Sequence, residues 1–126
     1  MTVKQIANRL VELCRKGEYE TVYQELYSPD IVSAEPPGAQ MQIVKGFPGL
    51  KMKGAAWNEG IEEMYGSAVG DPIIADDHFA ITMSMDYKAK GGPRINHSEI
   101  CVYRVEEGKI TREEFFYSPV PTAEQG

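Results

Sequence analysis

Three ionisable residues near the end of the chain fall on a strand face that the sequence pattern marks as core. Residues 94–117 read RINHSEICVYRVEEGKITREEFFY, which predicts two long strands joined by a tight glycine turn. Along the first strand the odd positions are more apolar than the even ones, so we place the odd face inward. His97, Glu99 and Glu113 then lie in an apolar setting, where ionisable groups have shifted pKa values and can transfer protons.

The turn between these strands decides which residues share a face. A glutamate adopts positive φ poorly, so we predict a three-residue loop over residues 106–108 with the glycine in the left-handed position of a bulge. In that register Glu113 opposes Cys101 and is a diagonal neighbour of Glu99. Odd residues of both strands line the inner face, and even residues such as Ile110 lie on the outer one.

His97 and Glu99 stand two residues apart on one strand, a spacing that allows a proton relay. A metal site would need Glu113 as a further ligand, and no helix carries the spaced histidines of a zinc enzyme, so no metal site is predicted. The sequence also lacks a nucleotide-binding loop and a nucleophile elbow. No cofactor is therefore expected.

Composition limits the classes of partner. The chain has 126 residues, enough for one domain over 1–126, with 13 basic and 19 acidic residues and a net charge of −6. This balance, without a basic cluster, argues against nucleic acid and anionic membranes. No apolar run approaches a spanning helix, and the N-terminus lacks the apolar core of a secretion signal, so a cytoplasmic protein is expected.

Hydrophobic periodicity predicts three helices and a sheet. Thr2 caps a helix that ends at Gly17, a second helix follows, and a weakly patterned loop or edge hairpin separates a short strand from the third helix. Four long antiparallel strands complete the chain. Helices are expected over 3–16, 18–26 and 46–60, and strands over 31–35, 61–75, 79–86, 94–105 and 109–117. We predict an α+β fold, with three N-terminal helices packed on a curved antiparallel sheet that encloses a pocket.

The third helix and the central strand carry further candidates. Trp57 is expected to face the sheet or stand at the pocket mouth, whereas Lys51 and Lys53 are placed on the side that points away from it. Met83 and Met85 alternate with polar residues, as in a half-buried strand, and are read either as core or as an adaptable wall for a flat apolar ligand.

Residues 13–36 read LCRKGEYETVYQELYSPDIVSAEP, a helix opens at Gly46, and residues 101–117 read CVYRVEEGKITREEFFY. In combination these segments resemble the nuclear transport factor two-like superfamily, in particular its SnoaL-like and ketosteroid-isomerase-like branch, over essentially the whole chain. The resemblance implies a cone-shaped α+β barrel with a pocket between helices and sheet. It also implies a homodimer formed through the outer sheet face.

The resemblance suggests roles for several residues. In ketosteroid isomerases and polyketide cyclases the general base is a carboxylate at the end of the short strand after the second helix, and Glu35 stands at the matching position. The first-helix tyrosine of ketosteroid isomerases is replaced by Leu10, which argues against steroid isomerisation. Tyr103, Tyr117 and Glu99 are the hydrogen-bond donors that the sheet can offer, and both Glu99 and Cys101 stand near the family's carboxyl position.

We therefore expect a small-molecule pocket protein without a cofactor, in which Glu35, Glu99 and His97 carry acid–base chemistry on a carbonyl-containing apolar substrate. The reaction would be an isomerisation, cyclisation or dehydration. The alternatives are a non-catalytic pocket for an apolar molecule with one polar end, and a dimeric scaffold. The expected ligand-binding residues are Leu10, Trp57, Met83, Met85, Tyr103, Glu113, Phe115 and Tyr117.

Overall fold

The computed structural model describes residues 1–119, and two helices open it. Helix α1 (Val3–Arg15) begins as predicted at Thr2, which forms a reciprocal capping box with Gln5. Gly17, with φ of 72°, turns the chain into α2 (Tyr19–Leu26). Within the described residues no helix has the length and apolar character that crossing a membrane requires.

One sheet holds the seven strands, in the order β2-β1-β7-β6-β5-β3, with β4 paired to β5. Strand β1 runs parallel to β7, and every other pairing is antiparallel. The sheet is therefore mixed, where an antiparallel one was predicted; the long stretch of chain between β1 and β7 permits a parallel pair. The strands are β1 (Tyr27–Ala34), β2 (Ile43–Lys45), β3 (Ile61–Val69), β4 (Ile73–Ala75), β5 (His78–Ala89), β6 (Arg94–Glu106) and β7 (Lys109–Phe116).

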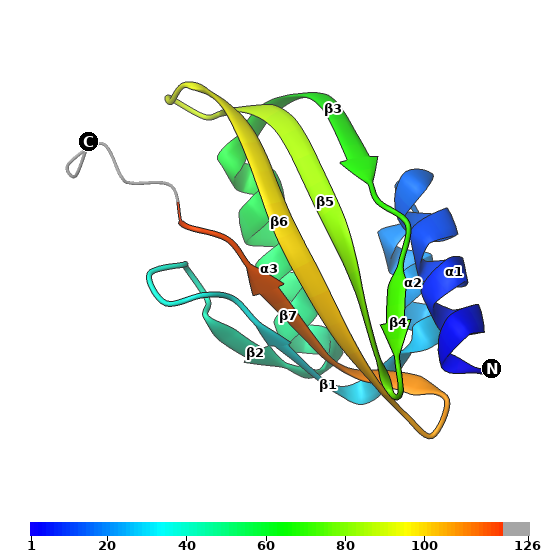
Figure 1. The fold of residues 1–126 in the computed structure, drawn as a ribbon. Coiled ribbons are helices and arrows are strands. Elements are labelled where there is room, and N and C mark those ends of the chain that lie inside the picture. The colour runs from blue at the N-terminus through cyan, green and yellow to red at the C-terminus, as the bar shows by residue number, and fades with distance from the viewer. Residues whose placement is uncertain (120–126) are drawn as a thin grey trace.

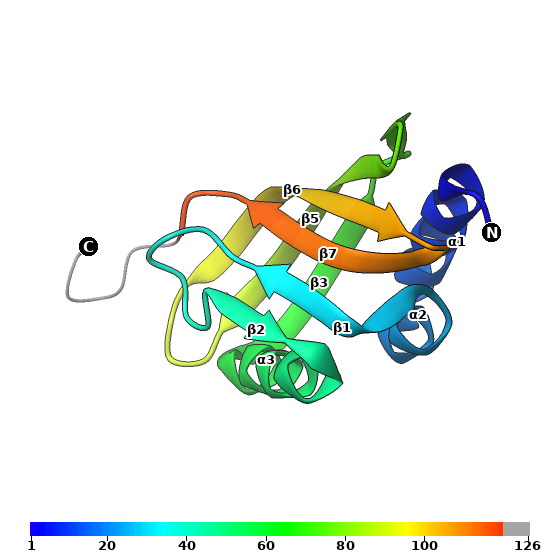
Figure 2. The same cartoon turned by 90° about the horizontal axis from the view of Figure 1, so that it is seen from below.

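The helices gather on one side of the curved sheet, which confirms the α+β prediction (Figure 1). Helix α3 (Gly46–Gly60) follows the predicted bounds. Seen from below, α1 and α2 lie at one end of the sheet and α3 at the other (Figure 2). The sheet is a curled cone and not a closed barrel, because β2 and β3 are its two edges.

Local interruptions of the ladders accompany this curvature. The pairing of β3 with β5 shifts register twice, between Ile61 and Glu63 and between Met64 and Gly66, as β-bulges do. The pairing of β1 with β7 shifts where Pro29 lies, since proline has no N–H to donate. The predicted edge hairpin is present, with β2 as its outer strand.

The turn of the β6–β7 hairpin differs from the prediction. Glu106 pairs with Lys109 across a two-residue loop in which Glu107 and Gly108 have φ of 51° and 77°. The twist of a long hairpin favours such a turn strongly enough to hold a glutamate at positive φ. The extra residue lies instead inside β7, where the register shifts between Arg104 and Val105.

This register corrects two of the predicted neighbours. Val105 pairs with Ile110, which is fully buried on the inner face and not on the outer one. Beyond the shift Glu113 pairs with Tyr103 and not with Cys101, so Glu99 is not its diagonal neighbour. The predicted inward face of β6 is nevertheless confirmed, because Cys101, Tyr103 and Val105 are all buried.

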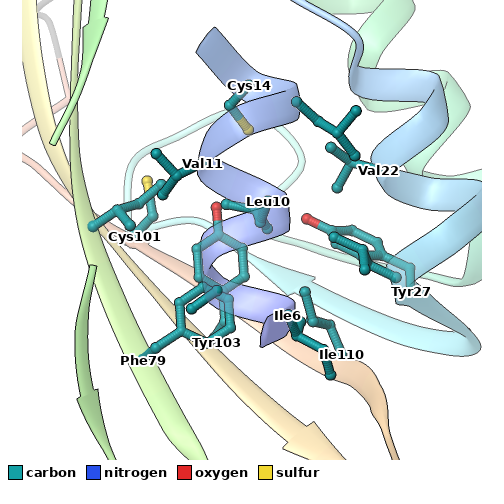
Figure 3. Close-up of a cluster of buried hydrophobic side chains, with 14 of the residues drawn as sticks. Ile6, Leu10, Val11, Cys14, Val22, Tyr27, Phe79, Cys101, Tyr103 and Ile110 are labelled. Atoms are coloured by element: carbon teal, nitrogen blue, oxygen red, sulfur yellow. The ribbon is translucent and has the colours of Figure 1, made fainter. Parts of the chain in front are cut away.

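The apolar core lies between α1, α2 and the inner face of β5, β6 and β7. Phe79 of β5 stacks on Tyr103 of β6 with ring centroids 4.8 Å apart. Figure 3 shows Leu10 on the side of α1 that faces Tyr27 and Tyr103. Leu10 is fully buried in this cluster, so the helix closes this end of the cone with apolar side chains.

Candidate active site

A polar group of side chains occupies the other part of the inner sheet face. Toward the start of β6 the inward positions are His97 and Glu99, in direct continuation of the buried Cys101. Strand β5 supplies their cross-strand neighbours, since Met83 pairs with Glu99 and Met85 with His97. The alternation of these strands therefore brings thioether and ionisable groups to one surface, as predicted.

His97 and Glu99 form a hydrogen-bonded pair. The distance from His97 Nε2 to Glu99 Oε1 is 2.8 Å, and Cys101 Sγ donates to Glu99 Oε2 at 3.1 Å. Burial, and next the Glu99 charge, raise the pKa of the Cys101 thiol, which therefore acts as a donor and not as a nucleophile. The edge of one ring meets the face of the other between His97 and Tyr117, with centroids 4.7 Å apart.

Glu35 lies directly after β1 and is held by two partners. The Lys53 ammonium is 2.6 Å from Glu35 Oε2, and the Tyr117 hydroxyl donates to Oε1. Burial, and next the hydrogen bond to Glu35, raise the pKa of Tyr117, which keeps its proton for this bond. The side chains of Glu35, Lys53, His97 and Glu99 are 12%, 21%, 11% and 10% exposed, so each retains some contact with solvent.

Lys53 points into the site, although the sequence analysis placed it on the side away from the sheet. Its position follows Leu50 by three residues and precedes Trp57 by four, which puts all three on one stripe of α3. Its ammonium lies 4.6 Å from the centre of the Phe115 ring and donates to Ser33 Oγ at 2.7 Å. Its helical spacing with Leu50 and Trp57 was the available signal for this orientation, and the usual exposure of lysine outweighed it in the prediction.

Glu113 is buried and accepts two hydroxyl donors. Ser33 Oγ donates to its Oε2 at 2.6 Å, and the Tyr27 hydroxyl donates to its Oε1. Burial raises the pKa of Glu113, while these hydrogen bonds and the Lys53 charge oppose the rise. Its hydrogen-bond partners are thus two hydroxyl groups.

Ser33 and Tyr27 belong to the site but were not among the predicted residues. Ser33 is fully buried between Ile31 and Glu35 in the alternation of β1. That period of two, which links Ile31, Ser33 and Glu35, was the available signal. Tyr27 was missed because β1 begins directly where α2 ends, four residues before the predicted strand.

The remaining predicted residues lie around this cluster or in the core. Trp57 packs its ring edge to face against Tyr87, with centroids 5.1 Å apart, and is partly exposed beside the site. Phe115 lies under the Lys53 ammonium. Tyr103 and Leu10 are fully enclosed by the apolar core. A role for any of these side chains in ligand binding stays a prediction.

A surface hollow of about 580 Å³ is lined mainly by residues of the outer sheet face, among them Thr82, Ser98, Ile100 and Phe116, and its lining also includes Met83 and Glu99. Ile100 and Phe116 pair across β6 and β7 and are each about half exposed, on the mixed face through which a homodimer was predicted. The dimer stays a prediction. Within residues 1–119 no three His, Cys, Asp or Glu side chains converge as metal ligands do.

The chain belongs to the SnoaL-like domain family, whose profile matches residues 1–117. No curated protein matches the sequence. A crystal structure from Mesorhizobium loti, of a protein named as a candidate SnoaL-like polyketide cyclase, is 32% identical. It covers 93% of this chain and 100% of its own, with a TM-score of 0.86.

Two more distant structures share the fold alone. An NTF2-like protein of unknown function from Burkholderia pseudomallei is 18% identical, with coverage of 94% and 92% and a TM-score of 0.75. A protein of ketosteroid isomerase-like fold from Catenulispora acidiphila is 19% identical, with coverage of 79% and 75% and a TM-score of 0.65. These likenesses confirm the predicted fold, whereas the family assignment rests on the SnoaL-like profile over residues 1–117.

Proposed function

We propose that the protein is a cofactor-independent acid–base enzyme that acts on a small carbonyl-containing apolar molecule, as an isomerase, cyclase or dehydratase. The observation that carries the proposal is the convergence of Glu35, Lys53, His97, Glu99 and Tyr117 on one surface. These residues come from distant parts of the chain. Ionisable groups gathered in a partly desolvated site are typical of catalysis.

Glu35 is the proposed proton acceptor. It would take a proton from a carbon next to the substrate carbonyl, leaving an enolate whose negative charge is on oxygen. The groups that can donate to this oxygen are the Tyr117 hydroxyl and the Lys53 ammonium, which already converge on Glu35. One of them must leave the carboxylate when the substrate binds, since they occupy one oxygen each.

His97 is the proposed second proton-transfer group. A carboxylate that accepts the Nε2 proton, as Glu99 would, leaves Nδ1 as the ring nitrogen that can exchange a proton with the substrate. Tyr117 lies between the two proton-transfer groups, because its hydroxyl contacts Glu35 and its ring contacts His97. Isomerisation removes a proton at one carbon and delivers a proton at another, and an aldol-type cyclisation delivers the proton to the oxygen of the carbonyl that the enolate attacks.

The wall beside these groups suits an apolar substrate. Met83 and Met85 lie next to Glu99 and His97 on the neighbouring strand, and Phe115 lies under Lys53. Thioether and aromatic side chains bind flat apolar molecules well. The candidate polyketide cyclase from Mesorhizobium loti supports a substrate of this kind.

A non-catalytic binding pocket is the second candidate. It is favoured by the pairing of Glu35, because both of its oxygens already have partners. In addition, the described part of the chain contains no fully buried side-chain nitrogen or oxygen without a hydrogen-bond partner. Such a satisfied network could hold the polar end of a ligand without moving protons.

Deuterium exchange separates the two candidates without requiring the natural substrate. The wild-type protein is incubated in D₂O with a panel of cyclic and aryl ketones, and incorporation of deuterium next to the carbonyl is followed by NMR. We expect protein-dependent exchange that falls by about 10²- to 10⁴-fold in Glu35→Gln, the usual contribution of a general base. The control is Glu59→Gln, an exposed carboxylate of α3, which should exchange like the wild type.

Two outcomes count against the enzyme. Exchange that persists at the wild-type rate in Glu35→Gln removes this residue from the mechanism. A panel that raises the melting temperature of the wild type without any exchange above buffer favours the binding pocket. Binding raises the melting temperature because a ligand that binds the native state stabilises that state by mass action.

A further inference from the structure

The hydrogen-bond chain between the two inner carboxylates has a defined direction. Lysine has donors and no acceptor, so the Ser33 hydroxyl oxygen must accept from Lys53 at 2.7 Å. A serine hydroxyl has a single proton, and Ser33 Oγ lies 2.6 Å from Glu113 Oε2. That proton is therefore directed to Glu113. Lys53 polarises Ser33, and Ser33 passes the effect to the buried carboxylate.

The same ammonium also contacts Glu35 directly, at 2.6 Å. Lys53 thus forms an ion pair with Glu35 at the partly exposed rim, and it contacts Glu113 in the interior through the Ser33 hydroxyl. An isolated ammonium in such a site is costly unless a carboxylate stays near it. The Tyr27 hydroxyl holds the Glu113 carboxylate in place. Glu113 therefore remains as a partner of the ammonium when Glu35 is protonated.

We propose that Glu35 and Glu113 share the Lys53 ammonium as a counter-ion, through a directed Lys53–Ser33–Glu113 chain. At rest the ammonium holds the Glu35 carboxylate in place. When Glu35 has accepted a proton from the substrate carbon, the ammonium stays paired through Ser33 and is free to approach the enolate oxygen. The consequence for Glu35 rests on the proposed function; the sharing of the ammonium does not.

The groups that face Glu113 come from every element packed around it. The pKa of Glu113 is raised by burial, and the Lys53 charge opposes this rise. Loss of the ammonium should therefore make Glu113 hold its proton to higher pH. The other titratable groups near Glu113 are Cys14 of α1, Tyr23 of α2, Tyr27 of β1, Glu35, and Cys101 and Tyr103 of β6.

The test follows the Glu113 carboxyl carbon by ¹³C NMR across pH, assigned through its absence in Glu113→Gln. We expect the midpoint of this titration to move upward in Lys53→Met and in Ser33→Ala, which breaks the same chain without removing a charge. Lys51→Met is the matched control, an exposed lysine of α3, and should leave the midpoint unchanged. A midpoint in both Lys53→Met and Ser33→Ala that equals the wild-type value overturns the proposal.

Exchange kinetics on the ketone panel then test the positioning role. Lys53→Met should lower kcat by about 10²-fold with KM little changed, because a misplaced base slows the reaction more than binding. Lys53→Arg, which keeps the charge, should recover part of the loss. If Lys53→Met moves the Glu113 midpoint but leaves kcat unchanged, the sharing of the ammonium is supported and its proposed role toward Glu35 is wrong. If the wild type shows no exchange, the proposed function fails while the titration still decides the sharing.

Discussion

The two helix-covered ends of the inner sheet face differ in how they are closed. Helix α1 buries six residues, Ile6, Ala7, Leu10, Val11, Leu13 and Cys14, against the sheet. Helix α3 is longer, yet Leu50 is its one buried residue. The same strand alternation runs beneath both helices. On β6 it presents the buried Cys101, Tyr103 and Val105 toward α1, and beyond them His97 and Glu99, which keep a small exposed fraction.

This difference separates the part of the fold that supplies stability from the part that is available for chemistry. Apolar burial is the main favourable term in folding, and α1 supplies most of the helical share of it. Under α3 the chain keeps three carboxylates and a lysine instead, each held by hydrogen bonds that offset its desolvation. Polar groups in a core position rarely improve stability, so the site under α3 is better explained by function.

Leu10→Ala is expected to have the largest effect. Leu10 is fully buried in the core under α1, so removing its side chain should cost about 2–5 kcal/mol of the free energy of unfolding. Met52→Ala, an exposed position on α3, should change it by less than about 0.5 kcal/mol. Urea denaturation measures both. A cost below about 1 kcal/mol for Leu10→Ala would mean that this end is loosely packed and has room for a ligand, as the sequence analysis expected of this residue.

Tyr27→Phe tests the border between the two halves. Tyr27 lies in the apolar core and donates to Glu113, so the variant leaves one buried carboxylate oxygen without its donor. We expect a loss of about 1–3 kcal/mol in the free energy of unfolding. Tyr19→Phe, at an exposed tyrosine of α2, is the matched control and should be nearly neutral. Equal stability of the two variants would contradict the role given to this hydrogen bond.

Most of the fold could be predicted from the sequence because its signals are local. The Thr2 cap, the helical stripe of α1 and the alternation of β5 each depend on neighbouring residues, and the structure confirms them. The parallel pairing of β1 with β7 could not be predicted, since it joins segments separated by most of the chain. The turn at Glu107 was wrong because the twist of the whole hairpin outweighed the local preference of one residue.

The candidate site was predicted in part, because some of its residues follow local patterns and others depend on tertiary packing. His97, Glu99 and Glu113 share the inner face by simple alternation, and Glu35 was found by its resemblance to a family position. The inward orientation of Lys53 was missed because lysine side chains are usually exposed, although its helical spacing places it on the side of α3 that faces the sheet. Tertiary packing decides which hydrogen-bond donors lie next to each carboxylate. The hydroxyl donors of Glu113 could therefore not be predicted from the sequence.

The pH dependence of stability sharpens the contrast further. Burial raises the pKa of Glu113 above its ordinary value of 4.5, so the folded protein holds this proton more tightly than the unfolded one. As pH rises from 4.5 through the raised value, this contribution to stability is lost, with a slope of at most about 1.4 kcal/mol per pH unit. Glu113→Gln should remove that slope in denaturation curves recorded over this window. Parallel curves for the variant and the wild type would show that Glu113 ionises as freely as in the unfolded chain.

The helix termini give the smallest expected effect and the same contrast. Thr2 caps α1 because its Oγ1 accepts from the Gln5 N–H and its own N–H donates to Gln5 Oε1, whereas Lys45, at the start of α3, makes no side-chain cap. Thr2→Ala should therefore cost about 1 kcal/mol of the free energy of unfolding, and Lys45→Ala less than about 0.5 kcal/mol. Hydrogen exchange at the first turn of each helix locates the change. If α1 begins to exchange faster in Thr2→Ala while α3 already exchanges fast in the wild type, the helix over the site is the less stable one, as its sparse burial implies.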